Sequence, residues 1–552
     1  MIYALQHPFK FVLLALLIML QGCSAMKESH YVPKSPEGMS EWVMEGSLVL
    51  RANGVKSESH FYFKQIDEKY ELAILMDDPV GEPKALITGN ICEPGSEVLD
   101  VMGGADAIKV ANQLKSSIEA GNLAYWLRGL PATADAVVYQ EEMNLPEKME
   151  ENGWKIYYHD FMSVVGGYRL PAEIKLKAEG KTLEVEMVRA ETGYLTHPCG
   201  QNQAEAEQNR KPDGAYSVES QDAVSRLVPK DGSAPLPLWI DEGAFCKQLA
   251  KIHDNKLPDP REGLYGPDSM MWELTGLSFP ASFGAGRALL LQVAHPWVTA
   301  GIDQHSVVRN DPLGRARRTF YHILSMTYGS MPQVMASANQ VRDIHEEIEG
   351  KMTEHAGAFE YGSEYRANEI NAMIWVHATL WETVVHMYEE MEHELSAEEK
   401  DQFYEETKLF AMLFGIPENA LPEDWNAFME YNRAMWESPQ LTVTPNAMQL
   451  KNDLFDAQSI WMIMPLWVQK NLTAANLPAR IRDQYEMKYG WWQKFNNSWI
   501  MAGAWTTQVL LPKSMERHPV YKEAQARLEG ERLGGYNQRM IEAFFDKERL
   551  VN

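Results

Sequence analysis

The hydrophobic pattern changes its period once along the chain, and this change most limits the folds that are possible. From about Trp42 to Tyr194 apolar and polar residues alternate, as in Glu71-Leu-Ala-Ile-Leu and Trp154-Lys-Ile-Tyr-Tyr. Alternation with period two predicts the strands of an antiparallel sheet with one wet face. Beyond Trp239 the apolar residues recur almost throughout at helical spacing. The chain is therefore predicted to be α+β, with a β domain followed by an all-helical domain.

The boundary between the two parts is expected in a polar stretch at residues 196–237. This stretch contains Ala204-Glu-Ala-Glu-Gln and Gly232-Ser-Ala-Pro, a composition typical of a linker. We expect a β domain over residues 41–195 and a helical domain over residues 238–552. A chain of 552 residues is also longer than a single hydrophobic core usually supports.

Several elements are specific enough to be placed in advance. A helix is expected at Asp106 to Ile118, where apolar residues recur once per turn. A hairpin is expected to join Ile174–Ala178 to Leu183–Met187 across Glu179-Gly180. The long helices of the second domain are expected near residues 284–305, 313–328, 333–349, 364–392 and 397–413.

Composition excludes two classes of protein. Hydrophobic residues make up 45% and charged residues 23%, which is incompatible with an intrinsically disordered chain. The formal net charge is −26 and no concentrated basic segment is present, so a nucleic-acid partner is not expected. The acidic residues are interpreted as a solvated surface.

The first residues carry an export signal. Lys10 precedes an apolar run from Phe11 to Leu20, which is too short to span a bilayer but matches the core of a signal peptide. The run ends in Leu20-Gln-Gly-Cys23, which resembles the lipobox of bacterial lipoproteins. The alternative is an ordinary secretory signal with a chance cysteine.

The lipobox resemblance implies a lipid anchor. Residues 1–22 would be the signal peptide, Cys23 the acylated first residue of the mature chain, and residues 23–40 its lipidated tether. Acyl chains anchor a protein to membrane lipid without a spanning helix. A non-acidic residue at Ser24 implies sorting to the outer membrane of a bacterial envelope, on the periplasmic side.

The remaining cysteines are few. Cys92, Cys199 and Cys246 allow at most one disulfide and leave one thiol over. An exported compartment permits such a bond, although the spacing does not dictate the pairing. No Cys-x-x-Cys pair is present, so neither a zinc ribbon nor a covalently attached haem is indicated.

The β part resembles a known family in three blocks. Tyr125-Trp-Leu-Arg-Gly-Leu-Pro131, Asn152-Gly-Trp-Lys-Ile-Tyr-Tyr158 and Arg169-Leu-Pro171 are similar to LolB, in that family's order. The resemblance implies an antiparallel half-barrel that accepts the acyl chains of lipoproteins, with a periplasmic lipoprotein chaperone as a partner. It also makes Val80 the counterpart of an apolar loop residue that inserts into lipid, although an ordinary turn residue is the alternative.

The residues alone leave the inner face of that half-barrel open to two interpretations. An apolar concave face is either a closed core or a cavity for lipid, and the hydrophobic pattern is the same for both. Trp42, Trp126 and Trp154 are expected as core or cavity-lining aromatics in either case.

In the helical part, one predicted helix places Arg315, Thr319, His322 and Met326 on one face. The neighbouring apolar residues indicate that part of this face is buried, and the alternative is a solvated basic face. A buried arginine needs an anionic partner, which a haem propionate or an iron-bound oxygen species would provide.

Two histidines are expected to lie in apolar surroundings. His345 shares a helix face with Val334, Ala338 and Val341, and a neutral imidazole on a dry wall suits axial ligation of haem iron. His295 lies in an apolar helix next to a proline that bends or ends the helix. Taken singly, each histidine is equally compatible with a hydrogen-bonded core residue.

The helical part resembles the MpaB and latex-clearing rubber oxygenase family through four ordered motifs. These are Gln292-x-x-His-Pro, Asp311-Pro-x-x-Arg-x-x-x-Thr319, Ile344-His345 to Gly350, and Trp375-Val-His-Ala-Thr-Leu380. The resemblance implies a globin-like or bundle domain that holds a non-covalent haem b. His345 would be the proximal ligand of the iron.

The same resemblance assigns the remaining site residues. Arg315 and Thr319 would lie near the haem as cofactor-binding and catalytic residues, His295 would be a further cofactor-binding residue, and Arg318 would approach the distal side. Dioxygen would be the co-substrate in the oxidative cleavage of an apolar, isoprenoid or lipid-derived substrate. The stretch near His305 has Asp303 as its only carboxylate where rubber oxygenases carry a glutamate, so rubber itself is not the expected substrate.

Other site classes fit less well. Glu390-x-x-His393 with His386 lacks the second Glu-x-x-His of a di-iron site and is interpreted as a solvated acidic face. No Gly-x-Ser-x-Gly elbow indicates a hydrolase. The alternative function is a LolB-type lipoprotein or lipid acceptor whose helical domain is a non-catalytic module.

Overall fold

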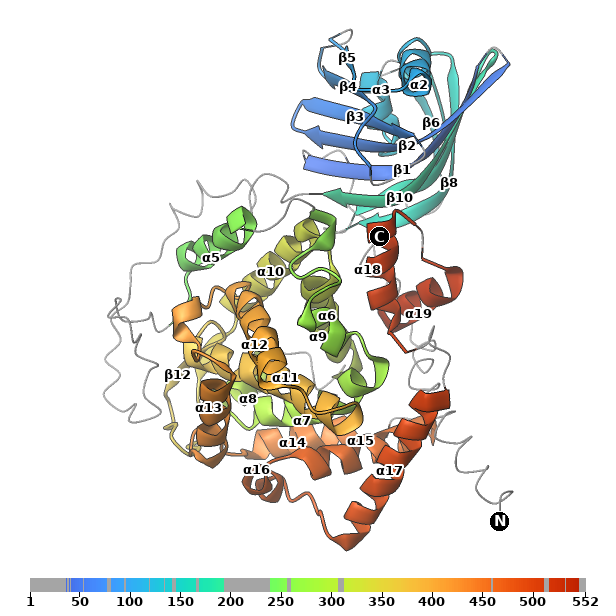
Figure 1. The fold of residues 1–552 in the computed structure, drawn as a ribbon. Coiled ribbons are helices and arrows are strands. Elements are labelled where there is room, and N and C mark those ends of the chain that lie inside the picture. Colours follow the sequence, from blue (N-terminus) through green and yellow to red (C-terminus); the bar gives the residue numbers. More distant parts are fainter. Residues whose placement is uncertain are drawn as a thin grey trace. The chain divides into compact units, whose positions relative to one another are not determined.

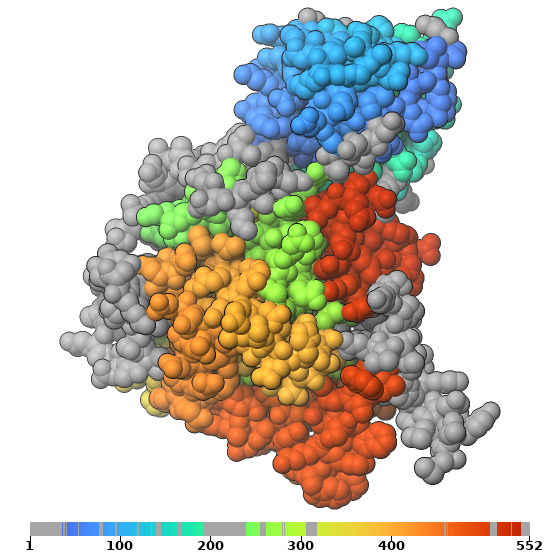
Figure 2. Space-filling view, in the orientation of Figure 1, coloured from blue at the N-terminus to red at the C-terminus, as the bar shows by residue number. Residues whose placement is uncertain are grey.

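A computed structural model provides the coordinates of the chain, drawn as a ribbon in Figure 1 and as a surface in Figure 2. It describes residues 36, 39, 41–192 and 239–545, with gaps at 53, 77–80, 94–95, 119, 134, 141–144, 165–167, 256–259, 306–311, 458–459, 511–515 and 532. The expected signal peptide, Cys23, Val80 and the whole of the expected linker lie outside the described residues.

The first part is a single antiparallel sheet, as the period-two pattern predicts. Its strand order is β5-β4-β3-β2-β1-β10-β9-β8-β7-β6. The strands are β1 (Glu41–Ala52), β2 (Val55–Ile66), β3 (Lys69–Met76), β4 (Ala85–Asn90), β5 (Val98–Val101), β6 (Val137–Gln140), β7 (Pro146–Glu151), β8 (Trp154–Val164), β9 (Tyr168–Ala178) and β10 (Lys181–Thr192). The predicted hairpin across Glu179-Gly180 is confirmed, with Leu183 opposite Leu176.

The turn of this hairpin requires glycine. Gly180 has a φ of 68°, in the left-handed region that side chains with a Cβ rarely adopt. The turn fixes the register so that Val185 faces Ile174, and both side chains are buried. A slip of one residue would move this row of apolar side chains to the wet face.

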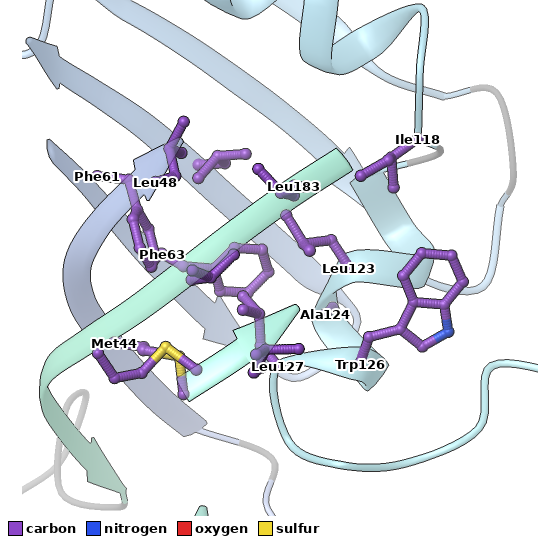
Figure 3. Packing of buried hydrophobic residues seen from close by; sticks show 14 of the residues in the cluster. Met44, Leu48, Phe61, Phe63, Ile118, Leu123, Ala124, Trp126, Leu127 and Leu183 are labelled. Carbon is purple, nitrogen blue, oxygen red and sulfur yellow. The ribbon is translucent and has the colours of Figure 1, made fainter. Parts of the chain in front are cut away.

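Two helices, α2 (Ala105–Lys115) and α3 (Ala120–Trp126), cover the concave face of the sheet. Helix α2 was predicted at nearly these bounds. Leu114 of α2 belongs to one buried cluster with the sheet residues. Figure 3 shows Leu123 of α3 in the same cluster with Leu48 and Phe63 of the sheet. The inner face is therefore packed by helix side chains in the described structure.

The three tryptophans expected on this inner face are core residues. Trp42, Trp126 and Trp154 are buried. The Trp42 indole donates to Gln65 Oε1 at 2.9 Å, and the Trp126 indole donates to Glu151 Oε2 at 2.6 Å. Both indole N–H groups thus have partners, as buried indoles require.

The second part is predominantly helical, as expected from its hydrophobic period (Figure 1). Its α-helices are α5 (Glu242–Asn255), α6 (Met270–Thr275), α7 (Ser278–Val293), α8 (Pro296–His305), α9 (Pro312–Tyr328), α10 (Met331–Glu346), α11 (Ile370–Met391), α12 (Ala397–Met412), α13 (Trp425–Glu437), α14 (Pro445–Phe455), α15 (Ile463–Asn476), α16 (Ala479–Gln484), α17 (Trp491–Leu510), α18 (Pro519–Glu529) and α19 (Gly535–Phe545). Short 3-10 turns occur at η3 (Pro260–Glu262), η5 (Glu418–Ala420) and η6 (Ile460–Met462).

Two expected helices differ from the prediction. The stretch 284–305 is divided into α7 and α8, because Pro296 starts a new helix after His295. The stretch 364–392 begins with β12 (Glu364–Arg366), which pairs with β11 (Glu349–Lys351). Glu369 then caps α11 by accepting from the backbone N–H of Ala372 at 2.7 Å, so this helix cannot start earlier.

The chain divides into two compact units. One contains residues 201–328 and 337–521 and is called the helical unit here, and the other contains residues 26–200, 329–336 and 522–552. No helix of the described residues is long and apolar enough to cross a membrane.

Candidate functional site

Helices α9 and α10 carry the histidines that the sequence singles out most strongly. These two helices are consecutive in the chain and are joined by a short turn at Gly329 and Ser330. His322 of α9 and Ser337 of α10 are hydrogen-bonded, with Nδ1 and Oγ 2.8 Å apart. Burial lowers the pKa of His322 to about 4, so this imidazole is neutral at pH 7.

His345 lies in the last turn of α10 and is partly buried. Burial, and to a lesser extent the nearby His322, lowers the pKa of His345 to about 4. The residue is partly accessible, and its ring lies near that of Phe414, with centroids 6.3 Å apart. His345 is therefore a partly buried imidazole that is neutral at pH 7 and lies at the end of its helix.

The predicted face of α9 runs from exposed to buried. Thr319 and Arg318 are exposed, His322 is partly buried, and Met326 is buried. Arg315 lies in α9, but its side chain is outside the described residues. The prediction that part of this face is buried is confirmed toward the end of the helix.

His295 lies in different surroundings from His345. It is buried between α7 and α8, with Phe359 at 5.0 Å and Trp297 at 6.3 Å between ring centroids. Burial lowers its pKa to about 3, and its Nδ1 has no hydrogen-bond partner. No described contact joins His295 to His345.

Two of the sequence motifs meet between α7 and α11. The Trp375 indole of α11 donates to the backbone oxygen of Leu291 in α7 at 3.0 Å. Arg287 of α7 and Glu382 of α11 form a buried ion pair, with Nη2 to Oε1 at 3.1 Å. The motifs around residues 286–296 and 375–380 are thus parts of one packed helix pair.

His377 in α11 is a buried histidine that the sequence motif contains but that was not singled out. Its Nδ1 accepts from the Trp381 indole at 3.2 Å, while its Nε2 has no hydrogen-bond partner. Burial lowers its pKa to about 3. The signal available in the sequence was its position between Trp375 and Trp381 on an almost entirely apolar helix.

Aromatic side chains connect His377 to His345. Trp381 packs on Phe410 with centroids 4.8 Å apart, and Phe410 packs on Phe414 at 5.4 Å. Phe414 in turn neighbours His345. The side chains that run from Phe414 to Trp381 are therefore all aromatic, and they are called the aromatic wall below.

One property of His345 is compatible with a haem ligand. A proximal ligand must be a neutral imidazole with a free nitrogen lone pair, and strong desolvation keeps His345 neutral. Among the residues that the structure describes, no three His, Cys, Asp or Glu side chains are grouped as a metal ion would require. Haem needs only one such ligand from the protein, so the two observations are compatible.

The alternative cluster near residue 390 has other partners. His386 Nε2 lies 2.7 Å from Asn476 Oδ1, and the His393 ring packs edge-on against Tyr388 at 5.4 Å. Glu389 forms an ion pair with Lys400. These side chains serve packing and surface pairing.

Of the cysteines, Cys92 is an exposed free thiol and Cys246 is disulfide-bonded. Cys199 lies outside the described residues.

Two family models match the chain. Residues 40–189 match the model described as outer membrane lipoprotein LolB. Residues 272–508 match the model described as ER-bound oxygenase mpaB/B'/rubber oxygenase, catalytic domain. The second match includes α9 and α10 with Arg315, Thr319 and His345.

Curated relatives are similar to the first part. The outer-membrane lipoprotein LolB of Pseudomonas fluorescens is 26% identical over 211 residues, covering 35% of this chain and 98% of that protein. The LolB of Ectopseudomonas mendocina is 27% identical, covering 33% and 94%. A solved lipoprotein-sorting domain from Vibrio parahaemolyticus is 12% identical with a TM-score of 0.20, covering 29% and 88%. The chain therefore joins a segment that resembles LolB to a segment that resembles the catalytic domain of MpaB-type and rubber oxygenases.

Proposed function

We propose that the chain is an outer-membrane lipoprotein whose helical unit is a haem b-dependent oxygenase for a hydrophobic substrate. The observation that carries the proposal is the neutral His345 imidazole beside an aromatic wall, inside a segment that matches an oxygenase catalytic domain. The LolB-like part would place this activity at the membrane, because its curated relatives are named outer-membrane lipoproteins.

In this proposal His345 holds the haem through its Nε2 or Nδ1, and the aromatic side chains beyond Phe414 keep water away. Arg315 would pair with an anionic group of the cofactor, and Thr319 and Arg318 would contribute hydrogen-bond donors at the same helix. His295 would act as a more distant residue of the cofactor site. A bound haem supplies the redox-active iron at which dioxygen is activated for cleavage of a carbon–carbon double bond to carbonyl products.

The rest of the site would select an apolar substrate. Asp303 is the carboxylate near His305, where the family resemblance would lead us to expect a glutamate. It accepts a hydrogen bond from Asn446 Nδ2 at 3.0 Å. It is therefore already engaged at a neighbouring helix, which supports a substrate other than rubber. An isoprenoid or lipid-derived chain fits both the apolar wall and a lipid-handling first domain.

Absorption spectroscopy tests this proposal. A chain beginning at Ser24, expressed with ample haem, is expected to show an intense Soret band that His345→Ala removes. His355→Ala is a matched control, because His355 is an exposed histidine of the same unit. His295→Ala is expected to shift the band without abolishing it. A colourless wild-type chain, or an undiminished band in His345→Ala, would contradict the proposal.

A second function is favoured by the first part. Its concave face is apolar and is covered by α2 and α3, which supports a lipid or lipoprotein acyl-chain acceptor that opens when those helices move. In that case a periplasmic lipoprotein chaperone would deliver the cargo, and the helical unit would be a non-catalytic partner module. A colourless chain that binds acylated peptide would favour this function over the first.

A further inference from the structure

Helix α17 leaves a row of large aromatic side chains exposed to solvent. Trp491, Trp492, Phe495, Trp499 and Trp505 are between 51% and 68% exposed. Soluble surfaces rarely carry contiguous apolar area of this kind without a partner. The row therefore needs a physical explanation.

The rings form a continuous strip. Trp491 and Trp492 stack with centroids 4.0 Å apart, Phe495 lies 6.2 Å from Trp492, and Trp499 lies 6.0 Å from Phe495. Residues at these spacings point to one side of a helix.

The opposite side of α17 is already used for packing. Ile500 and Ala504 are buried against Val468 and Leu472 of α15. The outer strip is therefore additional to the core contact that holds the helix in place. Helices α15 and α17 lie next to one another in the helical unit (Figures 1 and 2).

The neighbouring segment of η6 and α15 extends the exposed surface. Ile460, Ile463, Met464 and Trp467 are 76%, 56%, 45% and 41% exposed, and they recur at the spacing of one helix face. These four residues and the five exposed aromatics of α17 are called the aromatic face below.

The charges on these helices favour one kind of partner. Helices α15 and α17 contain no Asp or Glu, and their only charged residues are the exposed Lys470 and Lys494. The whole chain has a net charge of −26, so an apolar surface on two helices without carboxylates is an exception. Lys470 also lines a pocket with Asp453 and Asp456 at the end of α14, so Lys494 is the cation next to the aromatic strip of α17. Such a surface complements anionic phospholipid headgroups above a hydrocarbon layer.

The side-chain types of the aromatic face also favour a lipid bilayer as the partner. Tryptophan has an apolar body with one polar N–H and favours the boundary between headgroups and acyl chains. Helices that lie in this boundary combine Trp and Phe on the buried side with lysine beside it. We infer that the aromatic face docks the helical unit onto the surface of an anionic phospholipid bilayer. This contact is separate from the acyl anchor expected at Cys23 and does not depend on haem.

Vesicle flotation tests the inference. The probe is a set of vesicles made of phosphatidylethanolamine and phosphatidylglycerol, and the protein is the chain beginning at Ser24, which keeps every described residue. We expect the chain to float with these vesicles and its tryptophan emission to shift to the blue. The variant W492Q/F495Q/W499Q is expected to bind at least about tenfold more weakly.

Two further variants keep the result interpretable. Tyr361→Gln changes a residue that is 75% exposed elsewhere in the helical unit, and it should bind as the wild type does. K470Q/K494Q should lose most of the preference for anionic vesicles over phosphatidylcholine vesicles. Circular dichroism confirms that each variant is folded.

Three outcomes would overturn the inference. The first is a wild-type chain that does not float with anionic vesicles. The second is equal binding by folded W492Q/F495Q/W499Q and the wild type. The third is a dimer that these substitutions dissociate, with no vesicle binding, which would show that a second copy covers the aromatic face.

Discussion

His322 and Ser337 are hydrogen-bonded across two consecutive helices, with 2.8 Å between Nδ1 and Oγ. This bond joins the helix that carries Arg315 and Thr319 to the helix that carries His345. If the proposed cofactor site is correct, this bond would help to position the two helices that carry its residues.

The first prediction concerns this bond. Ser337→Ala leaves the desolvated His322 nitrogen without its hydroxyl partner and should destabilise the chain by about 1–3 kcal/mol. It should also weaken haem retention while leaving the Soret band detectable, because His345 is unchanged. Competition with apomyoglobin measures haem loss. Ser498→Ala, at an exposed serine of α17, is the control. Haem retention equal to that of the wild type would show that the bond does not position the site.

The second prediction concerns pH. The folded pKa of His377 is about 3, below the ordinary value of 6.5, because burial disfavours the charged ring. Between these values the unfolded chain binds a proton that the folded chain excludes, so this contribution to stability is present above about pH 6.5 and is lost as the pH falls toward 3.

His377→Gln keeps an acceptor for Trp381 and removes the titration. It should reduce the slope of the unfolding free energy by up to about 1.4 kcal/mol per pH unit in acid. Urea unfolding at a series of pH values measures this slope in the haem-free chain. His355→Gln should leave the slope unchanged, and an unchanged slope in His377→Gln as well would refute the assignment.

The third prediction concerns the buried pair of Arg287 and Glu382. Glu382→Ala leaves an unpaired guanidinium that is almost fully buried, and it should destabilise the chain by about 3–5 kcal/mol. Lys351→Ala removes an exposed pair with Glu364 in the same unit and should cost less than about 1 kcal/mol. Thermal unfolding measures the loss of stability in each variant. Equal losses would mean that the packing of α7 against α11 does not depend on the pair of Arg287 and Glu382.

The fourth prediction concerns lipid access to the sheet. Leu114→Ala empties space between α2 and the concave face, so it should destabilise the domain by about 2–5 kcal/mol and increase the binding of a fluorescent fatty acid. Ile108→Ala changes an exposed residue of the same helix and should do neither. Fluorescence titration distinguishes them. Equal probe binding by both variants would place the lipid site elsewhere.

The sequence predicted the layout of both parts because their hydrophobic periods are long and regular. The hairpin across Glu179-Gly180 and the helix at α2 follow from local signals, and the structure confirms both. The division of α7 from α8 was not predicted, because Pro296 was expected either to bend or to end the helix at His295. The structure shows that it ends the helix. The strand β12 was missed because its three residues pair with β11, a contact that no local pattern encodes.

The site was predicted less completely. His345 was identified because it shares an apolar helix face with Val334 and Ala338, both of which are buried. The aromatic wall from Phe414 to Trp381 was missed, because it is assembled from α11, α12 and the turn after α12, all of which are distant in sequence from His345. The roles of His345, Arg315, Arg318, Thr319 and His295 stay predictions.

The most direct test of the central claim is chemical rescue at position 345. His345→Gly removes the imidazole and leaves room for a small ligand in the last turn of α10. The account predicts that this variant loses the haem spectrum of the wild type and regains it when imidazole is added. A His345→Gly variant that shows the wild-type spectrum without imidazole would contradict the claim that this side chain binds the iron.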